Sequence, residues 1–521
     1  MLHSLIMINM GVSVSRKEFI AGLAAAGGWR GLRAFAVPAG SCSRDRPNLR
    51  FGLLSDLHIR CTEPSLSPAR FEQALLWFRD RGIDAVVIAG DMSDLGLGDE
   101  LMLVAETWFK VFPKDRAPDG RKVERLFVTG NHESCIFSGN GNLPRIRSLY
   151  GNDESEVRRQ LLRFDYAGWW ERAFGEPYER FYHRQVNGYD FLCAHWDSGK
   201  KLPDLPLDAF GWVKGKISVG QESFGVDLRN WLDQHGAALD PRRPFFYQQH
   251  RVLFDTNYGR WAWNHDQGLA TQALSAYPNA IAFAGDTHYS LTDERSIWQG
   301  AFTSVGTGSL RYTGLPDLSR SEGYENAGKP GVRTQPSYNT RDTPQGQLVS
   351  VYDDRVVFER RDFALNESLG DDWVLPMPNE AVKTYSFATR KAKAVPPEFP
   401  QGAELAAVCV RAKTVAQPSV EKPCVRLVIP PTVRKASARC FEYEVAVVAP
   451  DGERRLFHVL AEGFNRPVGH VRVGKATEAV LSRDRLPEKI DRIEVTPLDS
   501  WWNAGRFLTL SGEAIVGEKN A

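Results

Sequence analysis

The sequence predicts an α/β fold that is followed by an all-β domain. Between residue 48 and about residue 310, short apolar runs alternate with segments of helical periodicity, a pattern typical of layered α/β folds with covered sheets. From about residue 381 onward, short apolar runs follow one another at hairpin spacing, which indicates a sandwich of antiparallel sheets. At roughly 150 residues per domain, the length of 521 residues suits such a multidomain chain.

The first 36 residues are predicted to be an export signal. The stretch "SRKEFIAGLAAAGG" (15–28) has a basic pair before a short apolar run, and "AFA" (34–36) resembles a cleavage site of small residues. The basic pair has lysine where a twin-arginine signal has its second arginine. Such a signal would send a bacterial protein, already folded, to the periplasm or the extracellular space. The alternative is a disordered start with the first codon at Met10.

The α/β domain is expected to span residues 48–365. The segment "SPARFEQALLWFRDRG" (67–82) carries apolar residues at helical spacing and a proline in its first turn. The stretch "QLVSVYDDRVVFERRDF" (347–363) is predicted to be a hairpin that turns at Asp353-Asp354. Six apolar runs are predicted to be buried strands: 48–56, 83–91, 123–133, 188–198, 242–250 and 279–288.

Two segments rich in glycine, proline and polar residues divide the chain further. Residues 313–346 are predicted to be a long loop, and such loops are usually functional or disordered. Residues 366–380 are predicted to be a linker. The final residues, 381–521, are expected to form an immunoglobulin-like β-sandwich, in which Asp451-Gly452 marks a hairpin.

The composition argues against several classes of function. The formal net charge is +1, so neither nucleic acid nor an anionic membrane is an expected partner. No stretch after the export signal reaches about 18 apolar residues, so no membrane span is expected in the mature chain. The seven cysteines form no C-x-x-C pair, although one bridge among Cys409, Cys424 and Cys440 stays open. The pair Trp501-Trp502 is interpreted as packing rather than as a sugar-stacking platform.

Polar side chains follow the predicted strands where each strand ends. Asp56 and His58 come after the first strand, and Asp91 ends the second. Because ligand sites of open α/β sheets lie beyond the carboxyl ends of the strands, these side chains are expected to converge. Carboxylates, imidazoles and one amide oxygen are a ligand set for Zn, Mn or Fe. The full set is Asp56, His58, Asp91, Asn131, His132, His250, Asp286 and His288.

These motifs resemble the calcineurin-like metallophosphoesterase family, and the resemblance covers roughly residues 48–310. It implies a layered β-sandwich flanked by helices. It also implies a metal-dependent hydrolase of phosphoric mono- or diesters, in which two divalent ions activate a hydroxide. The matching pieces stand in the family's order: "DLH" (56–58), "GD" (90–91), "GNHE" (130–133), His250 after a strand, and "GDTH" (285–288).

The resemblance also implies a role for each residue of the set. Asp91 would bridge two metal ions, either Mn, Fe or Zn. His132 would contact the phosphate or protonate the leaving oxygen, which suits imidazole because its pKa lies near neutrality. One ion would be held by Asp56, His58, Asp91 and His288. The other would be held by Asp91, Asn131, His250 and Asp286.

The last motif departs from the family, which usually has Gly-His-x-His where this chain has Gly-Asp-x-His. Either Asp286 ligates the second ion, or it is too short and water fills its place. If Asp286 ligates, three carboxylates and two divalent ions leave a net charge of about +1. That charge favours a monoanionic diester over a dianionic monoester, and oxygen ligands favour Mn²⁺ over Zn²⁺.

A second hypothesis is a protein that keeps this fold but has weak or no catalysis, and binds a ligand such as a glycan through its C-terminal domain. Asp286 and the β-sandwich motivate this hypothesis, whereas the otherwise intact motifs argue against it. The expected substrate of an active enzyme is a small-molecule or glycan-linked phosphoester. His195, in "CAHWDS", is interpreted as a neighbour of the site with a structural role.

Overall fold

The computed structural model describes the chain from residue 46 to residue 517, apart from several internal ranges. The predicted export signal at 1–36 lies outside the described residues, as does most of the predicted loop at 313–346. In the part of the chain that the structure describes, no helix is both long and apolar enough to cross a bilayer. The ranges left out are 1–45, 134–142, 197–222, 260–261, 263–264, 316–331, 334–337, 341–342, 380–382, 415–416, 434–438, 467–469 and 518–521.

The first sheet has the strand order β15-β14-β13-β1-β2-β3, and β16 also pairs with β14. Strands β1, β2 and β3 run parallel, while β13 and β14 add an antiparallel hairpin beside β1. The three parallel strands and the hairpin confirm the sequence prediction. The bounds are β1 Leu49–Leu54, β2 Ala85–Ala89, β3 Glu124–Val128, β13 Gln345–Val351, β14 Arg355–Asp362, β15 Glu367–Ser368 and β16 Trp373–Pro376.

The second sheet has the order β4-β5-β6-β7-β9-β8. Its central strands β5, β6, β7 and β9 run parallel, and β4 and β8 close the two edges antiparallel. The three strands predicted at 188–198, 242–250 and 279–288 are β5, β6 and β7. The bounds are β4 Phe181–Val186, β5 Tyr189–Ala194, β6 Phe245–Gln248, β7 Ala280–Ala284, β8 Ile297–Gln299 and β9 Thr303–Gly306.

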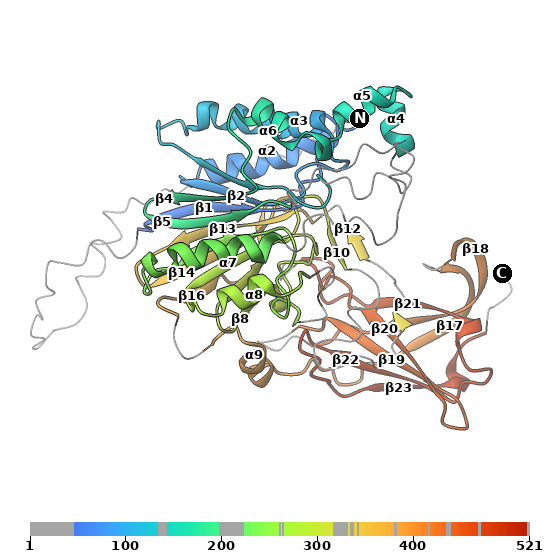
Figure 1. Ribbon diagram of the computed structural model, residues 1–521. Coiled ribbons are helices and arrows are strands. Elements are labelled where there is room, and N and C mark those ends of the chain that lie inside the picture. The colour runs from blue at the N-terminus through green and yellow to red at the C-terminus, as the bar shows by residue number, and fades with distance from the viewer. Residues whose placement is uncertain are drawn as a thin grey trace, which may run out of the picture. The chain divides into compact units, whose positions relative to one another are not determined.

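The two sheets pack face to face with helices outside them, which confirms the predicted layered sandwich (Figure 1). Phe51 stands at the centre and meets Phe191, Phe246 and Phe283 of the opposite sheet edge-on. Helices α2, α3 and α6 cover the first sheet, whereas α7 and α8 cover the second. The bounds are α2 Leu66–Arg79, α3 Gly98–Val111, α4 Leu143–Tyr150, α5 Glu154–Gln160, α6 Tyr166–Phe174, α7 Ser223–His235, α8 Leu269–Leu274 and α9 Phe387–Lys393.

Local sequence explains where several of these elements begin and end. Strand β2 reads AVVIA and is buried on both faces, as expected for a run of β-branched residues in a covered parallel sheet. The Asp165 side chain accepts from Gly168 N and caps the start of α6, and Gly175, in the left-handed region at φ 68°, ends that helix.

The stretch 366–380, which the sequence predicts to be a linker, contains two strands of the first sheet. Strand β16 pairs antiparallel with β14. Its side chains alternate, because Trp373 and Leu375 are buried while Val374 is 42% exposed. Pro376 is tolerated because it lies at the end of an edge strand. The two prolines in "WVLPMPNE" are typical of linkers, and for that reason the sequence pattern did not indicate this short strand.

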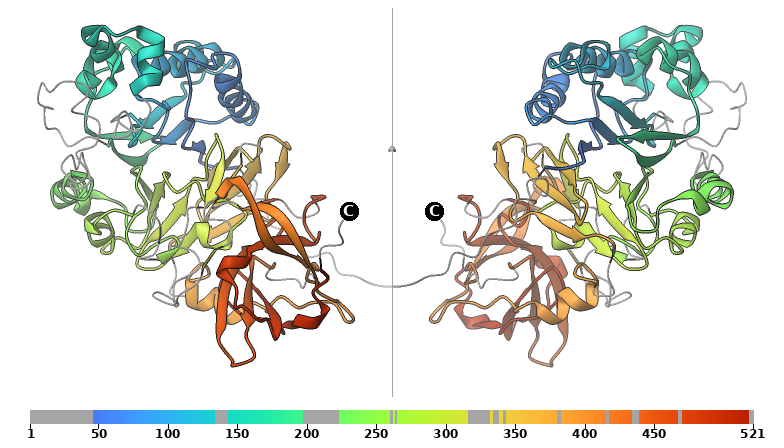
Figure 2. Two further views of the ribbon diagram at one scale, coloured as in Figure 1. Left: turned by 90° about the vertical axis from the view of Figure 1, so that its right-hand side faces the viewer. Right: turned by 90° about the vertical axis from the view of Figure 1, so that its left-hand side faces the viewer.

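Residues beyond the first two sheets form a β-sandwich, shown in orange to red in Figure 2. One sheet has the order β17-β18-β21 and the other β11-β20-β19-β22-β23, and their facing side chains share one apolar core. The predicted Asp451-Gly452 turn joins β19 to β20, and Cys409, Cys424 and Cys440 are free thiols. The bounds are β11 Val332–Arg333, β17 Ala406–Thr414, β18 Gln417–Ile429, β19 Glu442–Val448, β20 Arg454–Leu460, β21 Thr477–Ser482, β22 Arg492–Leu498 and β23 Leu508–Ser511. A separate two-stranded ribbon pairs β10 (Thr313–Leu315) with β12 (Tyr338–Thr340).

The β-sandwich packs against the second sheet's outer layer. Phe441, Leu460 and Phe464 belong to the same apolar cluster as side chains of β6, β7, α7 and α8. Trp501 is buried and meets Phe387 edge-on, and the Arg295 guanidinium lies over the Trp502 ring. Trp501 is therefore a packing residue, in agreement with the sequence interpretation, whereas Trp502 is only partly buried and packs against Arg295.

We predict that Phe464→Ala lowers the free energy of unfolding by about 3 kcal/mol, because it removes a buried aromatic side chain from this shared cluster. Chemical denaturation followed by tryptophan fluorescence measures the change. Phe507→Ala, at a side chain that is 57% exposed, is the matched control and should cost less than about 0.5 kcal/mol. An equal effect of the two substitutions would contradict a shared core.

Candidate metal centre

The site residues stand at the carboxyl ends of the parallel strands of both sheets, where the sequence places them. Five of them adopt backbone conformations in the left-handed region, which residues other than glycine seldom occupy. Strain of this kind is costly and concentrates at functional sites. The φ angles are 53° at Asp56, 44° at His58, 54° at Asp91, 67° at Asp286 and 54° at His288.

Glycines precede the ligands because neighbouring site residues occupy the space of a Cβ atom. A Cβ on Gly90 would overlap the His250 ring, and one on Gly130 would overlap the carboxylate of Asp91. These contacts explain in steric terms why Gly-Asp and Gly-Asn recur at the ends of the strands. They also bring loops from β2, β3 and β6 to one point.

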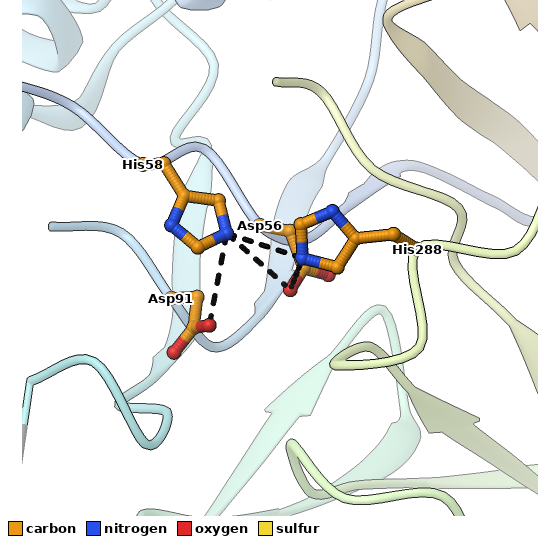
Figure 3. A group of neighbouring side chains, drawn as sticks. All are labelled: Asp56, His58, Asp91 and His288. Atoms are coloured by element: carbon orange, nitrogen blue, oxygen red, sulfur yellow. Dashed lines mark hydrogen bonds and ion pairs between the residues drawn. The ribbon is translucent and has the colours of Figure 1, made fainter. Parts of the chain in front are cut away.

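Asp56, His58, Asp91 and His288 offer four donor atoms within 4.8 Å of one another, a group that could hold a metal ion (Figure 3). All four side chains are buried. Nε2 of His288 lies 3.0 Å from Oδ1 of Asp56 and 3.2 Å from Nε2 of His58. Nε2 of His58 lies 3.8 Å from Oδ2 of Asp91. The structure thus brings together the four predicted ligands of the first ion.

The tautomer of His288 indicates that this group of four side chains requires a positive charge at its centre. Its Nδ1 donates to the carbonyl oxygen of Tyr312 at 3.0 Å, so the neutral ring turns the lone pair of Nε2 towards Asp56 and His58. Two ring nitrogens and a carboxylate oxygen that face one another need positive charge between them. A metal ion supplies that charge, and a backbone carbonyl behind the ring is the usual support of a ligating histidine.

The predicted ligands of the second ion meet around Nε2 of His250. The Nδ1 atom of that ring donates to the Ala89 carbonyl at 2.7 Å, which leaves the Nε2 lone pair facing inward. Around Nε2 lie the side-chain amide of Asn131 at 2.9 Å and two carboxylate oxygens, Oδ1 of Asp91 at 3.2 Å and Oδ1 of Asp286 at 3.7 Å. The lone pair of Nε2 and the carboxylate oxygens of Asp91 and Asp286 thus face one another. This group of electron-pair donors also fits a cation.

The pKa values report the same demand for positive charge. Burial would lower the pKa of His250, but the carboxylates of Asp91 and Asp286 outweigh burial and raise it. Burial would raise the pKa of Asp91, yet His250 and His132 hold it well below its usual range. For Asp286 burial prevails and raises the pKa to about 6.

His132 lies beside this group but differs from the other site histidines. Its Nδ1 donates to the backbone carbonyl of Asp94 at 2.6 Å, and its Nε2 lies 3.8 Å from Oδ2 of Asp91. Its side chain is 21% exposed, whereas that of His250 is fully buried. The ring therefore presents one nitrogen both to the site and to solvent, as a residue that contacts substrate must.

Two acidic residues support the site, although sequence reasoning gave them no role. Oδ1 of Asp94 lies 3.4 Å from Nδ1 of His58, behind that ligand. The buried carboxylate of Glu133 accepts from Ser93 N at 2.6 Å and from Gly130 N at 2.5 Å, so it ties the loop after β2 to the loop after β3. The sequence offered one sign of these roles, because Asp94 lies three residues after Asp91 and Glu133 ends the "GNHE" motif.

The aromatic rings of His195 and Tyr312 pack beside the site. His195 is buried against Trp170 and Tyr178, accepts from Thr129 N at 3.0 Å, and has a pKa lowered to about 3 by burial. It has the structural role that the sequence suggested. Tyr312, which sequence reasoning passed over, packs its ring on His288 at a centroid distance of 4.3 Å.

The family profile that matches this chain covers all of the site residues. The sequence profile of the calcineurin-like phosphoesterase family matches residues 49–290. Among solved structures, the chain is similar to a dimetal phosphatase from Danio rerio, with 13% identity, a TM-score of 0.36, and coverage of 63% of this chain and 99% of that one. It is also similar to purple acid phosphatase PPD1 from yellow lupin (Lupinus luteus) seeds, with 13% identity, a TM-score of 0.34, and coverage of 64% and 55%. No curated protein matches the chain.

We predict that Asp94→Ala weakens metal affinity about 10- to 100-fold, because the residue behind a ligating histidine fixes its ring. Competition with a chromophoric chelator measures the affinity. Asp80→Ala, at a side chain that is 62% exposed at the end of α2, should leave the affinity unchanged. If both variants bind the metal as tightly as the unaltered protein, Asp94 does not support the site.

Proposed function

We propose that the protein is a metal-dependent hydrolase of phosphoric esters, either mono- or diesters, as the match of residues 49–290 to the calcineurin-like phosphoesterase family supports. The observation that carries the proposal is the convergence of donor atoms at the strand ends. Lone pairs of His58, His250 and His288 and the carboxylates between them face one another in a buried space. Such an arrangement is stable only with positive charge inside it.

We assign two divalent ions to this space, and Mn, Fe or Zn suit its mixed nitrogen and oxygen donors. Asp56, His58, Asp91 and His288 would hold one ion. Asp91, Asn131, His250 and Asp286 would hold the other. When bound, two such ions attract a phosphate and lower the pKa of water.

The protein's own groups supply the remaining parts of the reaction. Asp91 lies between the two donor groups, since its Oδ2 faces His58 and its Oδ1 faces His250. The backbone carbonyl of Asp94 fixes the ring of His132, so that its Nε2 can hold a proton for the leaving oxygen.

We further propose that the protein is exported from a bacterial cell to the periplasm or beyond. The support is the sequence pattern of residues 15–36. N-terminal sequencing of the protein from its native host should give a mature end close to residue 37. An intact N-terminus, or one at Met10, would contradict export through this segment.

The function is tested by metal analysis together with a panel of phosphomonoesters and phosphodiesters. His132→Ala should keep its metal content and lose hydrolysis about 10²- to 10⁴-fold, as expected of a general acid. His183→Ala, on β4 and paired with Asp190, is the matched control and should retain activity. Metal loss in the His132 variant would contradict its catalytic role. Metal content without hydrolysis of any ester would favour the alternative, a binding protein of this fold.

A further inference from the structure

Arg251 occupies the edge of the second donor group. It directly follows His250 after β6, and its side chain is only partly exposed. The guanidinium lies 4.8 Å from the centroid of the Trp196 ring. That ring in turn meets the His250 ring edge-on at 5.9 Å. The aromatic face and the neighbouring ligand therefore hold the cation beside the site.

The hydrogen-bonding capacity of Arg251 is largely unused. A guanidinium has five N–H donors in a rigid fork. Nη1 donates to the carbonyl of His265 at 3.4 Å, whereas Nε is buried without a partner in the region that the structure describes. A buried donor without a partner costs free energy. No carboxylate among the described residues accepts a hydrogen bond from this guanidinium, so its partly exposed end can donate to an anion.

The other two arginines near the site are already paired. Arg60 donates to Asp94 at 2.7 Å, and Arg311 donates to Glu63 at 2.7 Å. Each is thereby engaged by a carboxylate. Arg251 has only an electrostatic attraction to Asp286 and Asp266, and burial outweighs it to lower the pKa of its guanidinium. Among these three arginines, Arg251 is the one from which no carboxylate of the described residues accepts a hydrogen bond.

The charge of Arg251 also bears on Asp286, the residue at which this chain departs from the usual motif. The positive charge of Arg251 is among the groups that lower the pKa of the Asp286 carboxyl against the effect of burial, so the two charges act on one another. Three carboxylates around two divalent ions leave a net charge of about +1, and Arg251 raises it to about +2. The site then has the charge it would have with histidine at position 286 and no arginine.

We propose that Arg251 binds the phosphoryl group of a dianionic phosphomonoester. The proposal rests on the proposed function and names its substrate class. A monoester has three non-bridging oxygens, so one is left for the guanidinium when two face the ions. A diester has two and leaves none. Arg251 therefore favours the monoester by charge and by oxygen count.

Arg251 adds a positive charge that was not counted when the sequence alone suggested a preference for diesters. That preference followed from counting Asp286 as an extra negative charge at the site. The sequence could not show that Arg251 lies beside it, because a lone arginine after a histidine carries no motif. The structure supplies the missing positive charge.

The test measures binding rather than turnover, with inorganic phosphate and dimethyl phosphate as probes of the two ester classes. Calorimetric titration of the metal-loaded protein at pH 8 should show tighter binding of phosphate than of dimethyl phosphate. Arg251→Met should weaken phosphate binding about 10- to 100-fold, with unchanged metal content and little effect on dimethyl phosphate. Arg251→Lys should fall between, because lysine keeps the charge but lacks the planar fork.

Arg81→Met is the matched control, because Arg81 also stacks on a tryptophan, 3.7 Å from the Trp77 ring, but at the end of α2. It should bind phosphate as the unaltered protein does. Unchanged phosphate binding in Arg251→Met and Arg251→Lys, or loss of metal from both, would overturn the proposal. Binding that depends on Arg251 without any ester hydrolysis would sustain this inference and refute the proposed function, so the two failures are distinguishable.

Discussion

The site depends on one repeated interaction, a histidine Nδ1–H that donates to a backbone carbonyl. His132 donates to Asp94, His250 to Ala89 and His288 to Tyr312. Each bond fixes the ring plane and the tautomer, so that Nε2 presents a lone pair or an exchangeable proton to the centre. Because the acceptors are backbone atoms, the positions of these rings are set by the loops themselves and not by other mobile side chains.

That dependence explains why the fold must hold the strand ends so closely. Parallel strands of both sheets end at the same edge, and apolar packing between the sheets fixes their separation. The loops beyond them then adopt left-handed conformations at five site residues, which costs free energy at each position. Buried interactions such as those of Glu133 with Ser93 and Gly130 offset part of this cost. The stability of the core thus permits strain at the site.

Sequence patterns predicted this architecture well where an apolar run indicates a strand and a ligand motif directly follows it. The runs that became β2 and β7 are apolar throughout, and β1 is apolar apart from Arg50. All three end in ligand motifs, so both strand and site could be located. Strand β16 was missed because its prolines are typical of linkers, although an edge strand tolerates them. Asp94, Tyr312 and Arg251 were missed for another reason: their roles arise from proximity in the folded chain to His58, His288 and Asp286, which periodicity and spacing do not encode.

The exchange at position 286 shows how a site can keep its charge while its geometry changes. A histidine there would be a neutral ligand, whereas Asp286 brings a negative charge whose oxygen lies 3.7 Å from Nε2 of His250. In a buried space an added charge is costly unless another charge compensates it. Arg251, held on Trp196 one residue after His250, brings a positive charge that attracts the Asp286 carboxylate. If Arg251 contacts the phosphoryl group as we propose, recognition of the anion would rely on the protein's own cation as well as on the ions.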